Sequence, residues 1–273
     1  MQSAIAQIAA ISIYGNYFLR KRYLPAFYPA NTAFMYCKKV FFVPLEGEDG
    51  ELRQVPYAQD PTTWFYVLAA HGVKGLRMHY RPLDDPDISD RMAVAFVGGG
   101  GRWLIETVKP GSSDYWEARW KLVRRSAPDN RIWEVAYGCV APNQESAPIQ
   151  RDDLSECVDG LKGVLCDIVA FARRHGLERF AQCFERGQGC LRSDLPLQDT
   201  FHRGVAPAGF LPLAACRLLG AAQAAWVFGG MGSWNDLGFE AAEHRVYEAL
   251  SDSLYNLLND AIVKATNTAY KPD

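Results

Sequence analysis

The spacing of apolar residues changes halfway along this chain, and the change constrains the fold more than any other feature. Up to about Val140, aromatic and β-branched residues are frequent, and Gly, Pro and Asp-Gly interrupt them at intervals typical of strands. Beyond residue 150, apolar residues recur at the three- and four-residue steps of helices. We therefore expect an α+β fold in which an antiparallel sheet from the N-terminal half is packed on one side by C-terminal helices.

The length of 273 residues is within the range of one large domain. The sequence predicts a single α+β domain over residues 1–273, with 1–142 mainly β and 150–267 mainly α. The apolar run from Ala4 to Ile13 is too short to span a bilayer and lacks the basic start of a signal peptide. We interpret it as a core strand or a short helix.

Four consecutive segments have the strand pattern: Met92 to Val97, Arg102 to Val108, Trp116 to Val123 and Ile132 to Val140. Strands that follow one another with short joints favour an antiparallel meander. Upstream, residues 40–57 predict a hairpin around Asp49-Gly50, and a short helix after Pro61 ends before a strand from Leu76 to Arg81.

The second half contains four predicted helices. An apolar stripe from Leu154 to Ala172 follows a cap at Asp152 or Asp153 and ends before Gly176. A shorter helix is expected over residues 177–185. Residues 211–228 are almost continuously apolar and are expected to form the central buried helix, with a strand at 225–228 as an alternative ending. The last helix is expected from about residue 240 to 267.

Charge and cysteine content exclude several classes of function. The net charge is −2 and the pI is near 6.2, so we expect no nucleic-acid partner and no attraction to anionic membranes. Seven cysteines occur without a CxxC pair or zinc-ligand spacing, which indicates reduced thiols in a cytoplasmic protein. We expect no metal and no cofactor.

The sequence contains no recognisable catalytic motif. Its five histidines form no His-x-x-x-His pair, and no nucleophile elbow or phosphate-binding loop is present. Cys190, in a glycine-containing stretch predicted to be irregular, precedes His202 by twelve residues and is the best candidate for a nucleophile with a base. We assign no catalytic residue from the sequence.

The most unusual local sequence is a glycine-rich loop before the last helix: Phe228-Gly229-Gly230-Met231-Gly232-Ser233-Trp234-Asn235-Asp236. In one interpretation Trp234 fills the core and Asn235 or Asp236 caps the helix. In the other, Trp234, Asn235 and Asp236 form a recognition surface with a stacking face and polar groups. Both interpretations stay open at this stage.

This loop also carries a resemblance. The stretch from Trp226 to Asp236, with Tyr247, Leu250-Ser251-Asp252 and residues 257–265 following, resembles the C-terminal part of uncharacterised bacterial proteins of toxin and immunity gene neighbourhoods. The resemblance covers roughly the last fifth of the chain. It implies an immunity-type protein, which binds and neutralises one toxin domain and needs no reactive centre.

Charge indicates which half of the protein would meet such a partner. Residues 1–150 contain 17 basic and 15 acidic residues, whereas residues 151–273 contain 12 basic and 16 acidic ones. A basic toxin domain would therefore meet the helical half. Glu243 and Glu248 of the last helix join Trp234, Asn235 and Asp236 as candidate binding residues.

Two alternatives belong to other functional classes. One is a small-molecule enzyme whose catalytic groups converge from separate loops, including His202 and residues 234–236; it requires a concave pocket with perturbed ionisable groups. The other is a subunit of a larger assembly that makes contact through exposed aromatic residues of segment 14–36.

Overall fold

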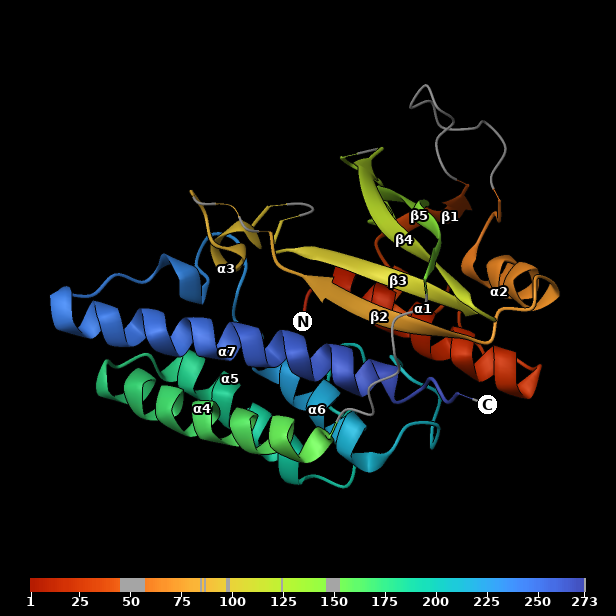
Figure 1. The fold of residues 1–273 in the computed structure, drawn as a ribbon. Coiled ribbons are helices and arrows are strands. Elements are labelled where there is room, and N and C mark those ends of the chain that lie inside the picture. The colour runs from red at the N-terminus through yellow and green to blue at the C-terminus, as the bar shows by residue number, and fades with distance from the viewer. Residues whose placement is uncertain are drawn as a thin grey trace.

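The computed structural model describes residues 1–44, 57–83, 85, 87–96, 99–123, 125–145 and 153–272. Within them a five-stranded sheet from the N-terminal half packs against helices that come mainly from the C-terminal half (Figure 1). The predicted α+β architecture is confirmed. None of the helices in these ranges combines the length and the apolar character that crossing a bilayer requires.

The sheet has the strand order β1-β5-β4-β3-β2. Its strands are β1 (Cys37–Val43), β2 (Gly75–Arg81), β3 (Arg102–Lys109), β4 (Ser112–Leu122) and β5 (Trp133–Glu145). All neighbouring strands are antiparallel except β1 and β5, which run parallel. The sheet is therefore mixed and mostly antiparallel, and β2 is one of its edges.

The predicted meander is correct for three of its four strands. The remaining segment, predicted over Met92 to Val97, is not a strand in its described residues 92–96, because a short helix, α3 (Asp90–Ala93), runs into it; the Ser89 side chain caps this helix by accepting a hydrogen bond from the Met92 amide. The strand that pairs with β3 on this side is β2, which forms where the sequence predicted a strand from Leu76 to Arg81. The turn of the predicted hairpin, residues 45–56, lies outside the described residues.

The first helix, α1 (Ser3–Lys21), is the most enclosed helix of the fold. Every residue from Ile5 to Asn16 is buried, as expected for a helix that is apolar on all sides. The helix contacts β2 and β3 and also the last helix. The expected strand or short helix over 4–13 is thus a longer helix, and α1 takes the central position that we expected of residues 211–228.

Helix α2 (Pro61–Ala70) covers the same face of the sheet as α1 and completes an aromatic core. The ring of Trp64 is stacked on Phe42 of β1 at 3.9 Å, and Trp116 of β4 meets it edge-on at 5.4 Å. These side chains belong to one buried cluster that continues into the C-terminal helices. The sheet and the helical layer therefore share a core.

Four helices form the second layer: α4 (Leu154–Arg174), α5 (Glu178–Arg192), α6 (Leu213–Ala224) and α7 (Ala241–Asn267). The predicted cap and stop of α4 are confirmed, because Asp153 accepts a hydrogen bond from the Ser155 amide and Gly176 has a φ of 68°. Helix α5 continues seven residues beyond its predicted end, so Cys190 lies on a helix and not in an irregular stretch. No strand follows α6 at residues 225–228.

Two asparagine side chains close the free edge of β2. The Asn16 amide of α1 donates to the Leu76 carbonyl at 2.8 Å and accepts from the Leu76 amide at 3.0 Å. At the end of α7, Asn267 makes the same pair of bonds with Met78, at 3.0 and 2.7 Å. Each side-chain amide thus occupies the place of a neighbouring strand, which protects the edge and joins both helices to the sheet.

This edge predicts a specific cost of substitution. Asn267→Ala leaves the Met78 backbone groups without these partners, so the free energy of unfolding should fall by about 1–3 kcal/mol. Asn256→Ala, at an exposed position of the same helix, should change it by no more than about 0.5 kcal/mol. Urea denaturation measures both variants, and equal stabilities would contradict this account of the edge.

Candidate functional site

The indole of Trp234 lies in the core. Its exposed fraction is 0%, and the rings of Phe180 and Phe184 from α5 and Tyr247 from α7 surround it at centroid distances of 5.2, 5.1 and 5.5 Å. The side chain therefore fills the space between these helices. Trp234 therefore fills the core, as in the first of the two interpretations of the loop, and its ring has no exposed face on which a ligand could stack.

Hydrogen bonds fix the backbone of the loop around this indole. Trp234 Nε1 donates to Ser251 Oγ at 2.7 Å, and the Tyr247 hydroxyl donates to the Trp234 carbonyl at 2.6 Å. Asp236 accepts from the Gly232 amide within the loop. The predicted capping of α7 is wrong, because Glu240 and not Asn235 or Asp236 occupies the N-cap position. The loop is closed on itself instead.

Asn235 and Glu248 converge on an arginine that sequence reasoning missed. Arg91 of α3 is only 2% exposed, and its guanidinium donates to Asn235 at 3.0 Å, to Glu248 at 2.6 Å and to Asp252 at 2.7 Å. Asn235 also donates to the Arg91 carbonyl at 2.7 Å. These four residues, which we term the Arg91 cluster, join α3 to the loop and to α7, which lie beside each other in Figure 1.

Glu243 belongs to a separate group on α7. Its carboxylate lies 2.9 Å from His175 Nε2 and 3.2 Å from Arg174 Nη2, both at the end of α4. The hydrogen bond from His175 is the main cause that lowers the pKa of Glu243. Glu243 and Glu248 are thus half-exposed and already ion-paired within the chain. Reversing either charge would disturb these contacts as well as any partner.

Exposed apolar side chains lie close to members of the Arg91 cluster along the chain. Met231, at the tip of the loop, is fully exposed, and Gly232 beside it has a φ of 81° that favours glycine. Met92 of α3 and Val246 of α7 are 39% and 42% exposed. Large apolar groups on a rigid, polar surface are common where another protein binds.

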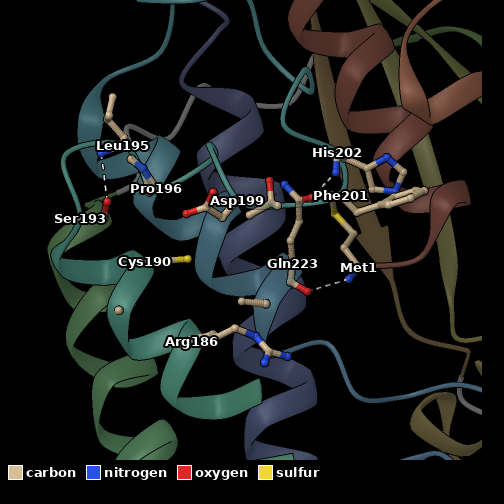
Figure 2. A pocket seen from close by; sticks show the side chains of 13 residues that line it. Met1, Arg186, Cys190, Ser193, Leu195, Pro196, Asp199, Phe201, His202 and Gln223 are labelled. Carbon is tan, nitrogen blue, oxygen red and sulfur yellow. Dashed lines mark hydrogen bonds between the residues drawn. The ribbon is translucent and has the colours of Figure 1, made fainter. Parts of the chain in front are cut away.

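A cavity of about 510 Å³ lies on another part of the helical layer, between α5, α6 and the segment that joins them (Figure 2). It is lined by Met1, Arg186, Gly189, Cys190, Ser193, Leu195, Pro196, Asp199, Thr200, Phe201, His202, Gln223 and Ala224. We term it the His202 cavity. The structure thus brings Cys190 and His202 to one site, as the sequence suggested, but residues 234–236 do not line it.

The ionisable groups of this cavity are poorly suited to catalysis. Burial lowers the pKa of His202 to about 4, and its Nδ1 lies 3.1 Å from Thr32 Oγ1. Burial raises the pKa of the Cys190 thiol, Asp199 raises it further, and Arg186 opposes them. At neutral pH the imidazole is therefore a weak base and the thiol is protonated.

A third group of charges lies within the sheet. Glu106 of β3 has an exposed fraction of 0%; Arg77 donates to both of its oxygens at 2.8 Å, and His79 Nε2 lies 2.6 Å away. Burial favours the neutral acid, but the hydrogen bonds of His79 and Arg77 outweigh it and lower the pKa of Glu106 to about 2. So weak a base stabilises the sheet and does not accept protons from a substrate.

Within the described ranges no three His, Cys, Asp or Glu side chains are grouped so that they could hold a metal ion.

One sequence signal could have identified Arg91, the residue that sequence reasoning missed. Ser89-Asp90, directly before it, is typical of a helix N-terminus. The apolar residues that follow instead favour a strand, which is why the sequence predicts one there.

The Arg91 cluster predicts a measurable loss of stability. Arg91→Met keeps the length of the side chain but removes its charged hydrogen bonds, so the free energy of unfolding should fall by about 1.5–3 kcal/mol. Hydrogen exchange of loop 229–236 should also accelerate. Arg245→Met, at an exposed arginine of α7, is the control. Equal effects of the two substitutions on both readouts would show that Arg91 does not hold the loop.

Glu106 predicts the direction of acid sensitivity. Its pKa is about 2 in the folded chain, below the ordinary value of 4.5, so its contribution to stability is complete above pH 4.5 and is lost as the pH falls toward 2. Urea denaturation at several pH values between 6 and 3 should show a smaller decline for Glu106→Gln than for the unmodified chain. If the stability of the variant and that of the unmodified chain decline in parallel, this explanation is wrong.

The chain was compared with known proteins at three levels. No family model matches it, and no curated protein or solved structure matches it either. The surface around Arg91 and the His202 cavity are therefore the features from which a function can be inferred.

Proposed function

We propose that the protein is an immunity-type protein, which binds a basic toxin domain and neutralises it. The binding surface comprises loop 229–236 and the first half of α7, up to Asp252, and we term it the acidic face. The observation that carries the proposal is the loop itself: it is rigidly tied to the core and to Arg91, yet presents a fully exposed methionine.

The charge of the acidic face supports a basic partner. Residues 229–252 contain five acidic side chains and one basic one, Arg245. Arg91 engages Glu248 and Asp252, and Arg174 engages Glu243, but these three side chains remain 41%, 54% and 45% exposed. Carboxylates arranged in this way accelerate the encounter with a positively charged domain and disfavour acidic ones.

The rigidity of the loop supports tight binding. A flexible loop loses conformational entropy when it binds, whereas a loop that is already fixed does not. Ser233 Oγ donates to the Gly229 carbonyl at 3.1 Å, and the Trp234 amide donates to the Val227 carbonyl at 3.1 Å. Met231 is thereby held as an apolar side chain that a complementary pocket could bury.

The two alternative functions have less support. Of the eight aromatic residues of segment 14–36, four are buried (Tyr14, Phe18, Phe27 and Phe34), two are partly buried, and Tyr23 and Tyr36 are exposed. As the expected contact surface of a larger assembly, segment 14–36 therefore offers two exposed rings, both beyond the end of α1. An active site at the His202 cavity would have to use a weakly basic imidazole and a protonated thiol.

Two exposed side chains test the surface without disturbing the Arg91 cluster. Glu240→Lys reverses a charge for which no ion pair is found among the described residues, and Met231→Asp replaces the apolar tip. Each substitution should weaken binding of the neighbouring gene's product, the partner that the proposal implies, by about tenfold or more. Isothermal titration calorimetry gives the Kd, and unfolding experiments confirm that the variants are folded.

The matched control is Glu156→Lys, which reverses an exposed charge in the first turn of α4. Helices α4 and α7 are antiparallel, because Gly160 lies against Leu257 whereas Arg174 lies against Glu243. The control is thus at the far end of the layer and should bind normally. If all three variants bind alike, the acidic face is not the interface.

The activity itself is tested in growing bacteria. Expression of the neighbouring toxin domain should arrest growth, and co-expression of this chain should restore it. Met231→Asp and Glu240→Lys should protect less well, at equal protein levels. A chain that gives no protection and no complex would refute the immunity function.

A further inference from the structure

We propose that the His202 cavity binds a free α-amino acid with a large apolar side chain. This inference does not depend on the toxin-binding proposal, because the cavity and the acidic face have no lining residue in common. It depends on the charges, the walls and the volume of the cavity.

Two opposite charges face the cavity and do not neutralise each other. Arg186 projects from α5, whereas Asp199 lies on the segment that follows α5, on the other side of the Cys190 thiol (Figure 2). Both line the cavity together with that thiol. Within the described ranges neither forms an ion pair with the other or with any further side chain, although the Arg186 guanidinium donates to Cys183 Sγ at 3.1 Å.

A zwitterion is the ligand that pairs both charges at once. A guanidinium binds a carboxylate through two parallel hydrogen bonds, and a carboxylate such as Asp199 binds an ammonium group. An α-amino acid carries both groups on one carbon atom. A simple amine or a simple acid would pair with one side chain and leave the other unpaired.

The walls favour an apolar side chain on this ligand. Leu195 and Phe201, at 68% and 57%, are among the most exposed large apolar residues of the described chain, and both line the cavity with Pro196. A ligand that covers them would remove apolar surface from water. The volume of about 510 Å³ is within the range of small-molecule sites and can hold a bulky amino acid.

The remaining polar groups fit a neutral lining. His202 is uncharged at neutral pH, and its backbone amide donates to Gln223 Oε1 at 2.9 Å. Gln223 Nε2, at the wall, is buried and has no hydrogen-bond partner among the described residues. A buried donor without a partner is the kind of group that an oxygen of a ligand or a trapped water satisfies. Among the lining side chains Arg186 and Asp199 are thus the two that carry charge, and burial lowers the pKa of the Met1 amino group, which also lines the cavity, to about 4.

Calorimetric titration of the full chain with L-phenylalanine, L-leucine and L-methionine tests the inference. At least one of them should bind. Its decarboxylated amine and its deaminated acid, which each keep one charge, should bind at least about tenfold more weakly. No binding by any of the three amino acids with a Kd below about 10 mM, or equal binding of the amine or the acid, would overturn the proposal.

Variants distinguish the two charges from the rest of the surface. Arg186→Gln and Asp199→Asn should each weaken the amino acid by about ten- to a hundredfold, whereas Arg186→Lys should retain more of the affinity. Arg192→Gln, at an exposed arginine later in α5, should bind as the unmodified chain does. Both target residues are exposed, so the variants should fold, and unchanged affinity in Arg186→Gln or Asp199→Asn contradicts the assignment.

Discussion

The exposed edge of β2 is the constraint on which the two layers depend. A strand at the edge of a sheet presents backbone groups that another strand can pair with. Here Asn16 and Asn267, from the two helices that are farthest apart in sequence, pair with the Leu76 and Met78 backbone. The contact fixes α1 and α7 against the sheet at the same time. The position of α7 then determines where its other half, with Glu248 and Asp252, meets Arg91.

The two ends of α7 therefore have different roles. Toward Asn267 it closes the sheet, and toward Glu243 it carries the carboxylates of the acidic face. Trp234 fixes the loop against the middle of this layer through Ser251. A binder needs such a scaffold, because each group that is fixed before binding lowers the entropy lost on association. The acidic face and the His202 cavity occupy different parts of the helical layer, so one chain could serve both.

The sequence predicted the features that depend on local spacing. The strands of 102–140 and the helices α4 and α7 follow from their periods, and Asp153 and Gly176 from their capping chemistry. It did not predict features that depend on long-range contacts. The run 92–97 is apolar enough for a strand, but Arg91 pairs with residues 157 and 161 positions away, which no local pattern reveals. The length and burial of α1 likewise result from layers on both sides of it.

In the candidate site, too, the residue types could be read from the sequence but the contacts between them could not. Trp234, Asn235 and Glu248 were chosen for their residue types, and the structure joins them to one network through Tyr247, Ser251 and Arg91. Glu243 was chosen with them but lies with His175. Cys190 and His202 share a cavity, although the sequence placed Cys190 in an irregular stretch. Spacing identified the groups, and only the fold could show which of them are neighbours and which are already paired.

Hydrogen–deuterium exchange of the full chain, with and without the product of the neighbouring gene, tests the central claim most directly. If the acidic face is the interface, protection on binding should be confined to α3, loop 229–236 and α7 up to Asp252, with little change around Phe201 and in the sheet. Protection that instead centres on the His202 cavity or on the sheet, with none in loop 229–236, would contradict the claim that this rigid, acidic surface recognises the partner.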